Sequence, residues 1–251
     1  MEKVALNFTA LNQAVSVEVD ALPDEARLDE LLPALRILDD RLNEIALRQN
    51  GQPVTCAKGC SACCRIQPVP VTPVEAYSLS LLVESMAEPR REIVLSRFRD
   101  CVSRLEEAGL AQAYLEGRPA DSVEQAQANA RKYLDLMLVC PFLEDDACSI
   151  YATRPFTCRE YFVTSPKEFC SDPVSLPVRR APTMVSAGRA ILATEANLTG
   201  TAGYTVPLTL ALAFVREREG RFARTYSGRE LFDRGVKNLV ATSRPAPPAQ
   251  T

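Results

Sequence analysis

The cysteines are the residues of this chain whose type and spacing point most directly to chemistry. Eight of the nine cysteines fall into two groups, and the chain contains no histidine. The groups span 56–64 and 140–170, and their members are Cys56, Cys60, Cys63, Cys64, Cys140, Cys148, Cys158 and Cys170. Thiolates that lie two or three residues apart can chelate one soft metal ion. Because histidine is absent, sulfur must dominate such a site, which predicts zinc or an iron–sulfur cluster.

Two other uses of cysteine compete with metal binding. The N-terminus lacks the basic start and apolar run of a signal peptide, and no apolar stretch of about 18 residues occurs. We therefore expect a cytoplasmic protein without a membrane span, in which thiols stay reduced and disulfides are rare. Burial as a small apolar residue does not explain four cysteines so close together. It does fit Cys101, which lies on the apolar stripe of a predicted helix.

The adjacent pair Cys63 and Cys64 bears on how many sites there are. Neighbouring side chains diverge by about 100° on a helix and about 180° on a strand, so one metal would bind both poorly. We expect the pair to serve different partners and the two groups to interleave in space. Eight thiolates then make two four-sulfur sites, or one such site plus cysteines that are exchangeable, redox-active or packed.

Positively charged residues flank the cysteines. A four-thiolate zinc site or an oxidised four-iron cluster carries a net charge of about −2. We predict that Arg154 and Arg159 offset this charge and donate hydrogen bonds to sulfur, with a weaker expectation for Lys58 and Arg65. The alternative is that all four are ordinary surface cations.

Composition excludes several classes of function. The net charge of −3 and the pI of about 5.3 argue against a nucleic-acid surface. The absence of histidine excludes serine–histidine and cysteine–histidine catalysis. Neither G-x-G-x-x-G after a strand nor G-x-x-x-x-G-K-[ST] occurs, so a Rossmann-type cofactor domain is not expected.

Apolar periodicity predicts a mainly α fold, α+β at most, with helices that frame two cysteine-bearing loops. Residues 4–19 alternate as a β-hairpin that turns at 11–14, and 28–49 follows as a helix in which Pro33 is a kink or a second start. Further helices are expected over 73–86, 90–116, 121–139, 184–197, 207–219 and 228–242, with a mostly irregular segment over 140–183. We expect one domain over 1–243, comprising the hairpin (1–20), the metal-binding region (56–170) and the C-terminal helices (184–243). The Pro-rich residues 244–251 form a predicted disordered tail.

The spacing C-x3-C-x2-C-C, followed by C-P-F-L, C-x-I-Y, R-P-x-x-C-R and a last cysteine, resembles the YkgJ-type cysteine-cluster family. That family is described as a zinc- or iron-chelating domain, and flagellin lysine N-methylase has a related cysteine block. The resemblance covers about residues 56–170. It implies a metal centre held by the eight clustered cysteines without fixing which of them ligate.

The sequence leaves two classes of function open. The first is a cytosolic metalloprotein with an iron–sulfur cluster, slightly preferred, or Zn²⁺, whose enzymatic version modifies a protein or a small molecule by redox or methyl-transfer chemistry. S-adenosylmethionine would then bind without a Rossmann domain. The second is a non-enzymatic module. In it, zinc stabilises a protein-binding surface, or the module binds and delivers metal for other proteins.

Overall fold

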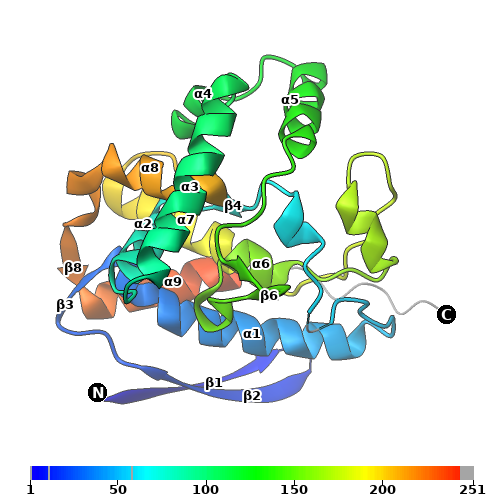
Figure 1. Cartoon of the computed structure of the whole chain (residues 1–251). Helices are drawn as coiled ribbons and strands as arrows, with labels where there is room; N and C mark the ends of the chain where they lie inside the picture. Colours follow the sequence, from blue (N-terminus) through cyan, green and yellow to red (C-terminus); the bar gives the residue numbers. More distant parts are fainter. Residues whose placement is uncertain (1, 11, 58, 244–251) are drawn as a thin grey trace.

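The computed structural model describes residues 2–10, 12–57 and 59–243, so the predicted tail at 244–251 lies outside the described residues. The fold is mainly helical with small two-stranded sheets, as predicted (Figure 1). The helices are α1 (Leu32–Gln49), α2 (Pro73–Glu84), α3 (Arg90–Glu107), α4 (Ala111–Leu115), α5 (Val123–Asp135), α6 (Phe156–Glu160), α7 (Ala187–Thr199), α8 (Ala211–Arg216) and α9 (Gly228–Ala241). The strands are β1 (Lys3–Ala10), β2 (Gln13–Asp20), β3 (Glu25–Arg27), β4 (Pro70–Val71), β5 (Leu143–Glu144), β6 (Ala147–Cys148), β7 (Val206–Pro207) and β8 (Thr225–Ser227).

The N-terminal hairpin of β1 and β2 lies along α1 (Figure 1). Its antiparallel register places Leu6 opposite Val17, and the valines of β2 are buried while the residues between them face solvent. This alternation is the one the sequence predicts. The turn is tighter than expected, because pairing continues to Ala10 and Gln13 and Asn12 adopts a φ of 61°.

Helix α1 begins where proline favours it. A short 3₁₀ turn over Leu28–Leu31 precedes it, and Pro33 lies in its first turn. Proline is tolerated there because the first N–H groups of a helix have no partner within the helix. Pro33 therefore marks the start of the helix rather than a kink.

Three predicted helices are clearly shorter than their apolar periodicity suggested. The one expected over 207–219 is helical only over Ala211–Arg216, because a strand residue and a 3₁₀ turn over Leu208–Leu210 occupy its first part. The expected helix over 90–116 is wrong as one element: Gly109, at φ 67°, separates α3 from α4. The amides of Gly109 and Leu110 bond back to Glu106 (2.8 Å) and Leu105 (2.9 Å), which is a Schellman ending. The expected run of 121–139 into Cys140 also fails. Helix α5 ends at Asp135, and Met137 has a φ of 49°.

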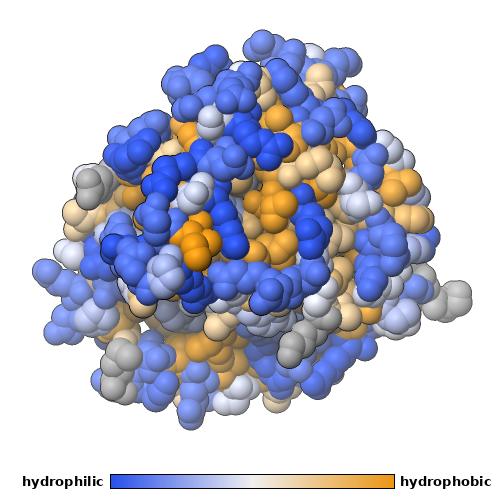
Figure 2. All heavy atoms as spheres, in the orientation of Figure 1, coloured by the Kyte–Doolittle hydropathy of each residue, from blue (hydrophilic) through white to orange (hydrophobic). Residues whose placement is uncertain are grey.

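Two apolar clusters share α2. One gathers α3, α4, α8 and the residues around Phe142, and the other gathers the hairpin with α1, α7 and α9. Ala76 and Leu79 of α2 belong to the first cluster, whereas Val74 belongs to the second. Hydrophilic residues cover most of the face shown in Figure 2, and hydrophobic residues are visible between them in small patches. Within the described part of the chain, no helix has the length and apolar character needed to cross a bilayer.

Short elements fill the segment predicted to be irregular. They are the β5–β6 hairpin, helix α6 and a 3₁₀ turn over Lys167–Ser171 that carries Cys170. The Ser165 hydroxyl does not cap that turn; it accepts a hydrogen bond from the Arg179 amide at 3.2 Å. In Figure 1 this segment lies beside the loop that carries the first cysteine group.

Candidate metal centre

The first cysteine group lies on a loop between α1 and α2. Gly59, at φ 83°, allows a tight turn in which the Cys60 amide donates to the Ala57 carbonyl at 3.0 Å. A 3₁₀ turn over Cys63–Arg65 then carries the adjacent cysteines. Lys58 lies outside the described residues, so its predicted role stays a prediction.

Hydrogen bonds hold this loop against the second group. The Cys140 amide donates to the Cys64 carbonyl at 2.7 Å, which joins the two groups backbone to backbone. Farther along, Gln67 Nε2 donates to the Cys170 carbonyl at 3.1 Å. The loop and the 140–170 segment are therefore neighbours in space, as expected from the adjacent pair.

Asp146 is a further anchor between the groups. It lies in the β5–β6 turn, where Asp145 and Asp146 both have positive φ, as a two-residue hairpin turn requires. Its carboxylate accepts hydrogen bonds from Ser61 (2.9 Å) and from the Arg65 guanidinium. Arg65 thus pairs with a carboxylate rather than with sulfur, which favours the ordinary-cation alternative for this residue.

Buried Glu75 holds helix α6, which carries Cys158. One Glu75 carboxylate oxygen accepts a hydrogen bond from the Thr72 amide at 2.9 Å and closes the capping box of α2. The other accepts from the Phe156 amide at 2.7 Å, at the start of α6. A sequence search for capping boxes finds the first contact, but the second joins residues far apart in the chain.

The thiols of the two groups influence one another. Burial, together with the neighbouring thiols of Cys148, Cys101 and Cys63, raises the pKa of the Cys140 thiol to about 12. Burial also raises the pKa of Cys158 well above its usual value, again with Cys140 and Cys63 as neighbours. Cys63 acts in the same way on Cys56 and Cys170, so it lies between the two groups. Without metal these thiols are protonated at neutral pH, and metal binding must release their protons.

The Cys64 side chain acts directly on the Cys63 thiol. The largest influence on Cys63 is a hydrogen bond with the Cys64 side chain, which together with burial raises the Cys63 pKa. The expectation of divergence assumed regular helix or strand geometry, whereas the pair lies on a single 3₁₀ turn. That the pair serves different metals stays a prediction.

Arg154 and Arg159 differ in what they offer the cysteines. The charges of both partly counter the burial that raises the Cys148 pKa. Arg154 stacks on the Tyr151 ring at 4.1 Å, and its buried Nε has no hydrogen-bond partner among the described residues. A free donor beside thiols is what a sulfur-bound metal needs from its surroundings.

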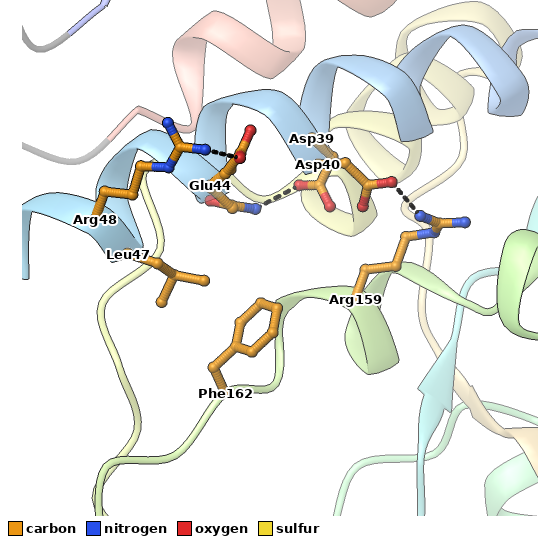
Figure 3. Close-up of a pocket in the computed structure, with 8 residues that line it drawn as sticks. Asp39, Asp40, Glu44, Leu47, Arg48, Arg159 and Phe162 are labelled. Carbon is orange, nitrogen blue, oxygen red and sulfur yellow. Dashed lines mark hydrogen bonds and ion pairs between the residues drawn. The ribbon is translucent and has the colours of Figure 1, made fainter. Parts of the chain in front are cut away.

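The side-chain nitrogens of Arg159 are directed elsewhere. Nε donates to the Arg154 carbonyl at 3.1 Å, Nη2 to the Ala152 carbonyl, and Nη1 to Asp40 of α1 at 2.5 Å. Figure 3 shows the last of these beside a cavity of about 370 Å³ between α1 and Phe162. The structure thus supports two roles for Arg159. It places a positive charge near the sulfurs, and its hydrogen bonds hold α6 in position.

The chemistry of the donors fits a soft metal, although their arrangement is not that of a closed site. All eight clustered cysteines are free thiols, and Cys101 is buried in the apolar core as predicted. Across 2–10, 12–57 and 59–243, no three cysteine, aspartate or glutamate side chains converge as metal ligands. Metal binding therefore has to draw the thiols together.

Comparison with known families agrees with this donor set. Residues 55–175 match the CxxCxxCC family model, described as a "Putative zinc- or iron-chelating domain". This match supports the resemblance to the cysteine-cluster family over residues 55–175. The domain covers just under half of the chain and contains all eight clustered cysteines. No curated protein and no solved structure gives a significant match.

The cysteine-cluster domain also depends on residues that sequence reasoning missed. Ser61 and Asp146 join its two groups, and Glu75 of α2 fixes its helix α6. Each is a common polar residue whose partner lies about 80 positions away in the chain. No local pattern distinguishes such residues from solvent-exposed ones.

Proposed function

We propose that this protein binds metal through both cysteine groups of its cysteine-cluster domain, with the eight clustered cysteines as its pool of ligands. The bond from the Cys140 amide to the Cys64 carbonyl is the observation that carries the proposal. It brings together two sets of thiols that are 76 residues apart along the chain. Ordinary packing of small apolar residues does not require such a gathering of thiols.

An iron–sulfur cluster is our slightly preferred cofactor, with Zn²⁺ as the alternative. The all-sulfur donors and the unpartnered Arg154 Nε support a centre with exposed sulfur charge. Zinc accepts the same four-thiolate ligation, and two zinc ions would account for eight cysteines. A cluster would supply electron transfer, whereas a closed zinc site would mainly stabilise the fold.

Two biological roles follow from these cofactors. A redox or methyl-transfer enzyme in the cytoplasm, acting on a protein or a small molecule, needs a coordinatively open or redox-active metal centre and, for methyl transfer, bound S-adenosylmethionine. A non-enzymatic module that binds a protein partner or handles metal needs neither. The metal-handling role gains support from a surface groove of about 360 Å³ that reaches Cys60.

Anaerobic purification followed by absorption spectroscopy, metal analysis and sulfide assay tests the choice of metal. We expect a brown protein with sulfur-to-iron charge-transfer absorption and acid-labile sulfide. A colourless protein loaded stoichiometrically with zinc would reject the cluster and favour the zinc module. Aerobic preparation is no substitute, because zinc can replace a lost cluster.

A further inference from the structure

The N-terminal hairpin leaves one edge of strand β1 unpaired. The hairpin lies on the outer side of α1 (Figure 1), and among the strands within residues 2–10, 12–57 and 59–243, β2 alone pairs with β1. The Ala21 amide donates to the Glu2 carbonyl at 2.9 Å, so the even-numbered residues of β1 exchange hydrogen bonds with β2. The odd-numbered residues therefore direct their N–H and C=O groups outward. They are Lys3, Ala5, Asn7 and Thr9.

This edge lacks the features that usually keep an exposed strand from pairing. Natural edge strands are short, bulged or interrupted by proline, or they carry charges along the edge. Strand β1 runs for eight residues without a bulge or a proline. Its one charged side chain, Lys3, lies at the end of the strand and pairs with Asp20 of β2 at 2.6 Å. The edge is therefore open to another strand along its whole length.

The apolar face of β1 is also incompletely covered. Helix α1 packs over β2, whose three valines are buried. On the same face of the hairpin, Val4, Leu6 and Phe8 of β1 are only half-buried. A further strand beside β1 would remove more of this apolar row from water, and such burial favours association.

We propose that two copies of this chain associate through β1, antiparallel about a two-fold axis at Leu6, and so form a four-stranded sheet. In this register Lys3 faces Thr9 of the second copy, and Ala5 faces Asn7 of the second copy. All of these residues have outward N–H and C=O groups, so each gains both of its hydrogen-bond partners. A symmetric interface of this kind closes as a dimer and leaves no free β1 edge. The association does not depend on the metal centre.

The side chains of β1 are self-complementary in this register, which favours a second copy over an unrelated strand. Val4 faces Phe8 of the second copy, so a small apolar residue meets a large one, and Leu6 meets its own counterpart at the axis. These are non-hydrogen-bonded pairs, in which side chains lie closest. Lys3 faces a threonine, so like charges are not opposed.

The four-stranded sheet also has room for both copies of α1. Neighbouring strands lie about 4.8 Å apart, so the two β2 strands would be separated by about 14 Å. Each α1 packs over its own β2. Packed helices need a separation of only about 8–10 Å, so the two helices fit side by side on one face of the sheet.

Sedimentation velocity of the full chain over a concentration series, with a reductant present to prevent disulfides, tests the association. The wild type should shift from monomer towards dimer as its concentration rises. Ala5→Pro removes an outward N–H but no bond to β2, and it should raise the dissociation constant of the dimer about tenfold or more, because a bond is lost on each side of the axis.

Ser16→Pro is the matched control. Ser16 lies opposite Asn7 in the hairpin, so its N–H also points outward, but from β2 at the other edge. Its dissociation constant should equal that of the wild type. A wild type that stays monomeric throughout, or equal constants for the two proline variants, would overturn the inference.

Charges placed at Thr9 test the register without touching the core. Thr9 is exposed and lies opposite Ala14 in its own hairpin, so a new charge there would act chiefly on Lys3 of the second copy. Thr9→Glu should tighten the dimer about threefold, and Thr9→Lys should weaken it about threefold. Raising the salt concentration should reduce both effects. Equal dissociation constants for Thr9→Glu and Thr9→Lys would overturn the pairing of β1 with itself.

Discussion

Of the residues near the cysteines, Arg154 has the surroundings that fit a bound metal best. Its Nε is buried without a hydrogen-bond partner among residues 2–10, 12–57 and 59–243, and its charge acts on Cys148. Loss of this donor should weaken metal binding, because polar groups around sulfur ligands stabilise their charge. We expect Arg154→Gln to lower zinc affinity about 10-fold to 100-fold in competition with a chelating dye. Arg224→Gln is a matched control, since Arg224 also stacks on a tyrosine, at 5.1 Å, but in a different part of the fold. Equal affinities for the two variants would contradict this role.

Asp39 predicts how stability depends on pH. It is 1% exposed, and burial together with Glu160 and Asp40 raises its pKa to about 9, while Arg159 opposes that shift. An unfolded carboxyl has a pKa of about 4, so between these values the unfolded state has lost a proton that the folded state keeps. The contribution of Asp39 is therefore fully present below pH ~4 and is lost as pH rises towards 9.

Asp39→Asn should remove that loss. The amide oxygen can still accept the bond that Asn43 donates to Asp39 at 2.8 Å. In urea unfolding, the wild type should lose stability relative to Asp39→Asn between pH 5 and pH 8, by up to about 1.4 kcal/mol per pH unit. Parallel stability curves for the two proteins would show that Asp39 titrates normally.

At the scale of elements, Glu75 links α2 to the cysteine-bearing α6. Glu75→Ala leaves the buried amides of Thr72 and Phe156 without acceptors, at about 1–3 kcal/mol each. Thr72→Ala removes just the helix cap, at about 1 kcal/mol. Urea unfolding at neutral pH should therefore show a clearly larger loss for Glu75→Ala. A loss no larger than that of Thr72→Ala would mean that the bond to α6 contributes little.

The helices and strands also show which parts of the fold could be predicted from the sequence. Capping residues and periodicity predicted α1, α2 and α9 closely, because those signals are local. The break at Gly109 was missed because the apolar stripe continues on both sides of a glycine whose left-handed φ is not visible in the sequence. The pairings β3–β8 and β4–β7 join short segments that are distant in the chain, so no local pattern predicts them.

At the scale of the whole molecule, two cysteine loops meet on a helical frame. From residue type and spacing the sequence predicted candidate donors, which stay a prediction, and the proximity of the two groups, which the structure shows. It could not predict Ser61, Asp146 and Glu75 as the residues that hold the loops, because their partners are set by tertiary packing. Since no three thiols converge in the part of the chain that the structure describes, metal should also raise the thermal stability of the protein by drawing them together, and a chelator should reverse that gain.

The most direct test of the account is the metal content of three variants purified anaerobically beside the wild type. Cys64→Ala removes a thiol from the first group, Cys158→Ala removes one from the second, and Cys101→Ala removes the buried core cysteine as a control. We predict that the first two each bind clearly less metal per chain than the wild type, and that Cys101→Ala binds as much. Full metal occupancy in both Cys64→Ala and Cys158→Ala would contradict a centre built from both cysteine groups.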